Sequence, residues 1–124
     1  MGFLLFIISV ILTILTVPLG ALYTLIKFSF KLKFIALFKI INAYFYKIAL
    51  SLDQLGNVSM QYILNDLLIT KEGYKFGDED ETISSVLGKN EKLDTLTKTG
   101  IFLNTILNRI DPDHSLNSIE EISH

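Results

Sequence analysis

The chain begins with an unbroken apolar stretch. From Gly2 to Ile26 it contains no Asp, Glu, Lys, Arg or His. A bilayer core about 30 Å thick is crossed by about 20 apolar helical residues, so this stretch is long enough to span a membrane. Pro18 lies inside it and is expected to kink the helix, because proline lacks the backbone N–H. The pattern therefore predicts a transmembrane helix over residues 1–26.

A cleaved secretory signal is the alternative interpretation of this stretch. Such signals have a basic n-region, an apolar core of about 7–15 residues and a small-residue cleavage site. Here no basic residue precedes the apolar run, the run is longer, and Leu19 interrupts the small-residue pattern beside Gly20 and Ala21. These features favour a retained helix.

Residues 27–52 combine dense aromatic residues with lysines at intervals of two to eight positions. Lysines among apolar residues suit an amphipathic helix at the membrane interface, where the long side chain reaches the headgroups. Anionic lipid would attract these cations. The predicted membrane-interface residues are Lys27, Phe28, Lys31, Lys33, Phe34, Phe38 and Lys39.

A second crossing through residues 34–52 is the alternative. It would place Lys39 and Lys47 in or near the membrane, at a cost of a few kcal/mol for a buried lysine. The positive-inside rule favours a cytoplasmic position for the lysines that follow the first span. A single crossing thus predicts a bacterial inner-membrane protein with its N-terminus outside and its tail in the cytoplasm, whereas two crossings would return the tail to the outside.

The tail, residues 53–124, is predicted to form a small acidic helical domain, so the fold class is all-α. Helical periodicity runs through residues 51–70 and again through residues 90–110, where Asp111-Pro112 ends it. Between them, residues 71–79 are rich in turn formers. Acidic residues then precede a short helix over residues 80–87, with Asp78 or Asp80 as its cap and Gly88 at its end.

Charge and composition exclude several classes of function. Residues 1–50 carry five lysines and no acidic residue, whereas residues 51–124 carry all thirteen acidic residues and the other six basic ones. An acidic tail argues against nucleic-acid binding, which needs clustered cations. The chain has no cysteine and only two histidines, which excludes disulfides, thiolate zinc sites and a multi-histidine metal site within one chain.

Three segments of the tail carry a recognisable pattern, SLDQLGN, GDEDETISSVLGKN and RIDPDHSLNSIEE. Together they resemble small, mostly uncharacterised and often membrane-anchored proteins of tailed phages and prophages. Those proteins share D-Q-x-x-N, D-E-T-[IL]-S-[SA] and D-x-x-H elements, usually with proline where this chain has Glu79. The resemblance points to Asp53, Gln54, Asn57, Asp80, Glu81, Thr82, Ser84, Lys89, Asp111 and His114.

These polar residues allow two interpretations. In the first, Asp53, Asp80 or Glu81, and His114 ligate one divalent ion, and a carboxylate or His114 acts as general base on water. Ser84 would be a nucleophile only with His114 within hydrogen-bond reach. In the second, the same residues hold the tail together through hydrogen bonds at helix ends.

The preferred hypothesis is non-enzymatic and needs no cofactor. It describes an inner-membrane protein of the phage type that acts by assembly or by binding another membrane protein, as in lysis regulation or superinfection exclusion. The alternative hypothesis is a membrane-tethered, metal-dependent hydrolase built on Asp53, Asp80 or Glu81, and His114. The catalytic candidates are Asp53, Ser84 and His114, and the predicted partners are the lipid bilayer and a membrane protein or a second copy.

Overall fold

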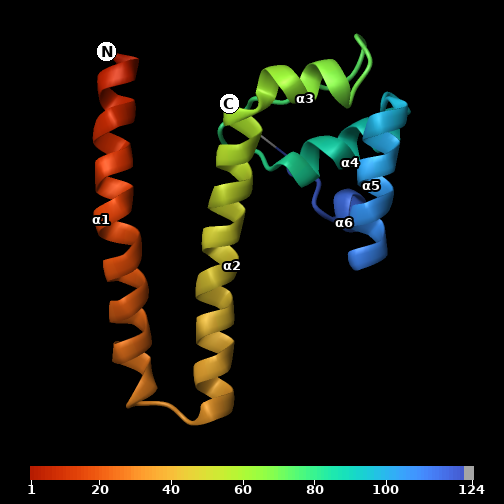
Figure 1. Cartoon of the computed structure of the whole chain (residues 1–124). Helices are drawn as coiled ribbons and strands as arrows, with labels where there is room; N and C mark the ends of the chain where they lie inside the picture. The colour runs from red at the N-terminus through yellow and green to blue at the C-terminus, as the bar shows by residue number, and fades with distance from the viewer. Residues whose placement is uncertain (122–124) are drawn as a thin grey trace. The chain divides into compact units, whose positions relative to one another are not determined.

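The computed structural model describes residues 1–121, and its regular secondary structure there is entirely helical, which confirms the all-α prediction. An isolated antiparallel bridge between Ile69 and Leu96 is the only β pairing in that range. The chain divides into two compact units at Tyr46–Lys47. Figure 1 shows the six helices, which are α1 (Gly2–Ser29), α2 (Phe34–Ser59), α3 (Gln61–Leu67), α4 (Ile83–Leu93), α5 (Lys98–Ile110) and α6 (His114–Asn117).

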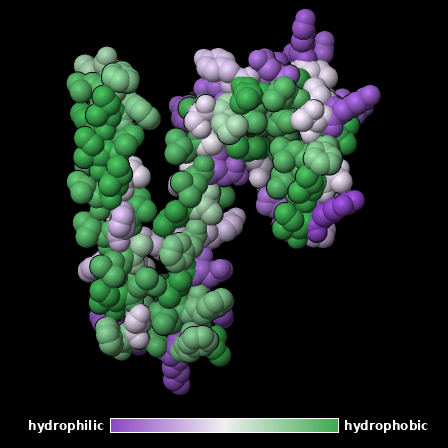
Figure 2. All heavy atoms as spheres, in the orientation of Figure 1, coloured by the Kyte–Doolittle hydropathy of each residue, from purple (hydrophilic) through white to green (hydrophobic). Residues whose placement is uncertain are grey.

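Helix α1 is apolar on every side, and none of its residues is buried. Figure 2 shows hydrophobic side chains over most of its visible surface. Three of its hydroxyl side chains are satisfied within the helix, since Ser9, Thr13 and Thr24 donate to backbone carbonyls three or four residues earlier. Such internal hydrogen bonding is what a helix in lipid requires. With its 28 residues, α1 is long and apolar enough to cross a membrane.

Helix α2 also meets the length and composition requirement for a membrane span. Residues 30–33 separate it from α1, and in the first unit the two helices run antiparallel (Figure 1). A Cβ atom added to Gly20 of α1 would lie 3.4 Å from the Tyr44 hydroxyl of α2. Lys27 and Phe28 lie in the last turn of α1, and α2 continues without a break from Phe34 to Ser59.

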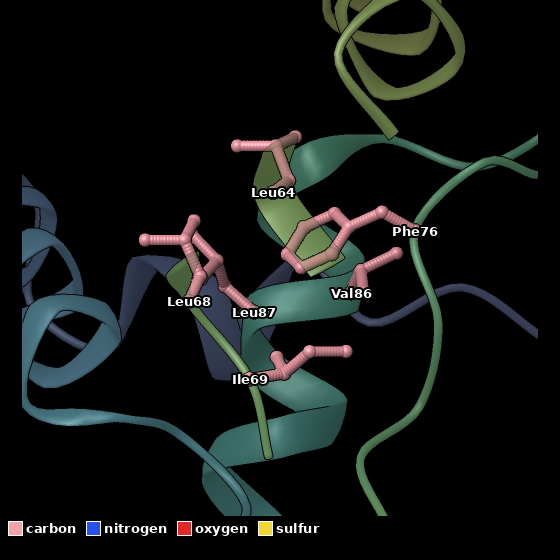
Figure 3. Close-up of a cluster of buried hydrophobic side chains, with 6 residues drawn as sticks. All are labelled: Leu64, Leu68, Ile69, Phe76, Val86 and Leu87. Atoms are coloured by element: carbon pink, nitrogen blue, oxygen red, sulfur yellow. The ribbon is translucent and has the colours of Figure 1, made fainter. Parts of the chain in front are cut away.

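The hydrophobic core of the second unit is small. Figure 3 shows its six buried side chains, contributed by α3, the segment that follows it, the loop before α4 and α4 itself. Leu103 and Leu107 of α5 pack against this cluster from one face of their helix. Each buried aliphatic side chain stabilises the fold by roughly 1.5–3 kcal/mol. The core consists of Leu64, Leu68, Ile69, Phe76, Val86 and Leu87.

Helix α4 differs from its prediction at both ends. It begins after Thr82, whose hydroxyl accepts a hydrogen bond from Ser85 N (3.1 Å), so the predicted aspartate caps were wrong. It also runs past Gly88 and ends at Asp94, which adopts a left-handed φ of 55°. Gly88 serves close packing instead, because a Cβ there would overlap the backbone oxygen of Ser115 in α6.

The periodic segment at residues 90–110 is divided between two helices. Thr97 caps α5 by accepting from Gly100 N (3.2 Å), and its own N–H donates to Leu68 O (2.9 Å). Gly100 is another close-packing position, since a Cβ would overlap that same carbonyl. The predicted end at Asp111 is confirmed. The chain after it forms α6 where no helix was expected, and residues 51–70 are interrupted at Met60.

We expect Gly88→Ala to destabilise the second unit by about 2 kcal/mol or more, because α4 and α6 would have to separate to admit the methyl group. Urea titration of the full chain in detergent micelles, followed by amide NMR signals of residues 61–121, measures this. Lys92→Ala on the exposed side of α4 is the matched control and should change stability by no more than about 0.5 kcal/mol. Equal stability of the two variants would contradict the packing argument.

Candidate functional site

The second unit brings the three catalytic candidates together. Asp53 lies near the end of α2, Ser84 in the first turn of α4, and His114 at the start of α6. One oxygen of Asp53 accepts from the backbone N–H of Ile83 (3.0 Å), and the other lies 3.2 Å from the Ser84 hydroxyl. Asp53 thus binds the N-terminus of α4, where the helix dipole favours a negative charge.

A chain of polar contacts continues from Ser84. Its hydroxyl lies 3.2 Å from His114 Nε2, and His114 Nδ1 lies 3.0 Å from Asp111 Oδ2. His114 therefore lies within hydrogen-bond reach of Ser84, which is the condition for Ser84 to act as a nucleophile. Asp53 and His114 also each lie within hydrogen-bond distance of Ser84. The two residues are therefore close together, as the hydrolase hypothesis requires.

The number of available protons decides which protonation state lets every contact in this series of side chains be a hydrogen bond. The three contacts from Asp53 through Ser84 and His114 to Asp111 need three protons. Ser84 supplies one, and a neutral imidazole supplies only one more. The imidazolium form supplies two, and Ser84 then donates to Asp53 while accepting from His114. In that arrangement a cation joins two aspartates, and Ser84 is not hydrogen-bonded to a free base.

Glu81 lies in a separate cluster and is completely buried. It forms an ion pair with Lys89, and it accepts hydrogen bonds from the Ser85 hydroxyl (2.6 Å) and the Tyr74 hydroxyl (2.9 Å). The Lys89 ammonium also lies 4.4 Å from the centre of the Tyr74 ring. Removing one partner from a buried ion pair is strongly destabilising, so these groups depend on one another.

The pKa values of two of these partners are shifted by Glu81. Burial raises the pKa of Tyr74 above its ordinary value, and the hydrogen bond to the Glu81 carboxylate adds to this effect. Burial alone would lower the pKa of Lys89, but the hydrogen bond and charge of Glu81 outweigh it, so the pKa is raised. Both shifts keep the proton on the group that faces Glu81.

Two amide side chains of α2 hold the loop before α4. Asn57, which is fully buried, donates to the carbonyls of Asp78 (3.0 Å) and Glu81 (2.8 Å) and accepts from Gly77 N (3.0 Å). Gln54 donates to the carbonyl of Asp80 (3.1 Å). These are contacts that the structural interpretation of the pattern residues expects.

The proposed ligand set for a metal does not converge. Glu81 binds Lys89 rather than facing Asp53, and Asp80 is exposed. Among residues 1–121 no group of three or more His, Cys, Asp or Glu side chains is placed to hold a metal ion. The structure thus groups Asp53 with His114 and leaves Glu81 with Lys89.

Sequence reasoning missed three members of these networks. Tyr74 lies in a loop without periodicity, and Ser85 follows the more prominent Ser84. Glu120 accepts from the Thr82 hydroxyl (2.8 Å), and its N–H donates to Ser85 Oγ (2.8 Å). No local pattern signals these pairings, because the partners lie up to 38 positions apart.

The raised pKa values predict how alkaline pH affects stability. A group whose pKa is higher in the folded state stabilises the fold fully below its unfolded pKa and loses that contribution as pH rises through the folded value. Stability of the second unit should therefore hold up to the ordinary values of 10.0 for tyrosine and 10.5 for lysine and fall above them. Urea titration of the full chain in micelles across this pH range measures the decline.

Tyrosinate absorbance provides the matched comparison. Subtracting the titration of Tyr74→Phe from that of the full chain should isolate a late-titrating phenol. Tyr62→Phe, at a position that is 78% exposed, is the control for the loss of one phenol. Titration of the Tyr74 phenol at the ordinary value of 10.0 would contradict the effect of its hydrogen bond to Glu81.

Comparison with known proteins does not assign the chain to a family. No protein-family model matches the chain, and neither the curated proteins nor the solved structures include a significant match. The resemblance to phage-type proteins therefore stays a prediction from the residues.

Proposed function

We propose that the chain is a membrane-anchored protein that acts by assembly or by binding another membrane protein, rather than by catalysis. The observation that carries this proposal is an exposed apolar stripe on α5. Phe102, Ile106 and Ile110 are spaced four residues apart, so they share one face of the helix, and they are 67%, 40% and 78% exposed. Figure 2 shows apolar atoms gathered over α5.

This stripe does not serve the core of its own domain. Leu103 and Leu107, on another face of α5, are the residues that pack against the buried cluster. A contiguous exposed apolar surface on a soluble region is typical of an interaction site. Burying Phe102 against a partner would supply the aromatic anchor that dominates the energy of many interfaces.

The polar network supports the same proposal from the opposite direction. Two first-turn N–H groups that could stabilise an oxyanion near Ser84 are occupied, since Ile83 N donates to Asp53 and Ser85 N donates to Thr82. The Asp53 carboxylate would also repel a negative charge that develops beside Ser84. The network thus suits a structural role better than acyl transfer.

For the membrane anchor we propose that both α1 and α2 cross the bacterial inner membrane. No residue in either apolar window is buried. About 20 helical residues from Phe34 reach Asp53, the first acidic residue of the chain. Lys39 and Lys47 then lie about 8–9 Å in from the two ends of the span, within reach of the headgroups.

Two crossings set the orientation of the whole chain. The turn with Lys27, Lys31 and Lys33 would face the cytoplasm, and the acidic tail would lie outside. The single crossing with a cytoplasmic tail, in which residues 27–52 lie along the interface, is the arrangement this proposal competes with. The resemblance to phage and prophage proteins supports lysis regulation or superinfection exclusion as the process served.

Hydrolysis is the second candidate function, and the 3.2 Å contact between Ser84 and His114 favours it. The metal-dependent version has Asp53 and His114 nearby but would need Asp80 or Glu81 to turn toward them. Ester hydrolysis by the full chain that disappears in Ser84→Ala, with the fold unchanged, would support this candidate over the binding proposal.

We expect Phe102→Glu to weaken association of the full chain by about tenfold or more, because a charge would replace the central apolar contact. Photocrosslinking from position 102 in cells, followed by sizing in micelles, distinguishes pairing with a second copy from capture of another membrane protein. Lys98→Gln on the same helix changes the net charge by the same single unit, and this control should associate like the unmodified chain. Unchanged association of Phe102→Glu, or a monomer without crosslinks, would refute the proposed interface.

A reporter fused after His124 tests the membrane arrangement. Two crossings predict an active periplasmic reporter and an inactive cytoplasmic one. Replacing Lys27, Lys31 and Lys33 by Gln should reduce that bias, because the positive-inside signal is lost. A reporter active only in the cytoplasm would overturn the two-crossing model and restore the single crossing.

A further inference from the structure

A pocket of about 230 Å³ lies between the end of α4 and α5. None of its lining residues is among the ten pattern residues, and it is independent of the proposed function. The pocket is lined by Asn90, Glu91, Asp94, Leu96, Ile101, Asn104, Thr105 and Asn108.

Asn104 contributes an unsatisfied acceptor to this pocket. The residue is only 5% exposed, and its amide nitrogen donates to Glu91 Oε2 at 2.8 Å. Since a carboxylate accepts hydrogen bonds and does not donate them, this contact fixes the orientation of the Asn104 amide, with its nitrogen toward Glu91. The Asn104 side-chain oxygen is buried without a hydrogen-bond partner in the part of the chain that the structure describes.

Asn108, one helical turn further along α5, repeats the arrangement. Its side-chain oxygen is likewise buried and unpartnered among residues 1–121. Buried polar atoms in proteins nearly always have a partner, so two orphaned acceptors in the lining of one pocket indicate a missing donor. The fully buried Asn90 needs none, because both ends of its amide are bonded to protein groups.

The electrostatics of the pocket select the charge of that donor. Glu91 and Asp94 supply carboxylates, and the lining contains no lysine or arginine. Helix α4 ends at Leu93, so the negative end of its dipole also lies at this pocket. A cation is therefore favoured over a neutral donor.

We infer that this pocket binds a primary ammonium group on an alkyl chain. The ammonium would donate to the oxygens of Asn104 and Asn108 and face the carboxylates of Glu91 and Asp94. Leu96 and Ile101 would cover the methylene groups. A calcium ion prefers six to eight oxygen ligands, which is more than these four side chains supply with one oxygen each. It would also make no favourable contact with Leu96 and Ile101.

The ammonium has two sources with the same chemistry, a free diamine or the lysine side chain of a bound protein. The full chain in dodecyl maltoside micelles would be titrated with cadaverine, with pentanediol as the uncharged counterpart, with calcium chloride and with a short lysine-containing peptide. Side-chain amide NMR signals of Asn104 and Asn108 report binding directly. We expect saturable shifts with cadaverine and none with pentanediol.

Three variants sharpen the test. Asp94→Asn should keep the fold, because asparagine tolerates the left-handed φ of 55°, and should weaken cadaverine binding by about tenfold. Asn104→Leu, which removes an orphaned oxygen at similar volume, should abolish the shifts at Asn108. Asn117→Leu on the exposed part of α6 is the control and should bind normally.

Each outcome decides the proposal. Tighter binding of the peptide identifies a protein lysine as the source, tighter binding of cadaverine identifies a free amine, and both support an ammonium site. Saturation by calcium chloride without a response to cadaverine would replace it with a metal site. No shift with any cation, or equal shifts with pentanediol, would overturn it.

Discussion

The buried carboxylate of Glu81 is the constraint around which the second unit is organised. A fully buried charge is tolerated only when it is paired and hydrogen-bonded, and Glu81 receives Lys89, Ser85 and Tyr74 together. These partners come from α4 and from the loop between α3 and α4. Satisfying Glu81 therefore fixes that loop against α4, and the loop in turn carries the core residue Phe76.

The end of α2 extends this constraint to the helix that joins the two units. Asp53 binds the N-terminus of α4, while Asn57 binds the loop before it at Asp78 and at Glu81. Among residues 1–121 the hydrophobic core has six buried side chains, so hydrogen bonds at buried positions contribute much of the specificity of this small domain. The pattern residues at helix ends thus have a structural purpose whether or not chemistry occurs at Ser84.

Ser84 and His114 illustrate how geometry alone can leave two functions open. Their separation is that of a nucleophile and its base, yet Asp53 holds the serine hydroxyl from the other side. When the Ser84 hydroxyl donates to Asp53 it does not donate to His114, so the imidazole is not placed to take the serine proton. The unpartnered surfaces of α5, one apolar and one lined by orphaned amide oxygens, are therefore better candidates for recognition than this polar chain is for catalysis.

The sequence by itself determined the helical class, the apolar first helix and the end of α5 at Asp111. Each follows from local information, namely apolar run length, periodicity and the conformational limits of proline. It also indicated that Asp53 and Asn57 bind the region where α4 begins. Residues 34–59 remained ambiguous, because lysines among aromatic residues suit either an interface or a span.

Only the tertiary structure decided how α4 ends and what its glycine does. Gly88 matches a helix stop by local rules, but the helix continues because α6 packs where a side chain would be. The same holds for Gly100 against Leu68, for Tyr74 against Glu81, and for the two unpartnered asparagines of α5. These features arise from contacts between segments distant in the chain, and no local pattern of apolar and polar residues encodes such contacts.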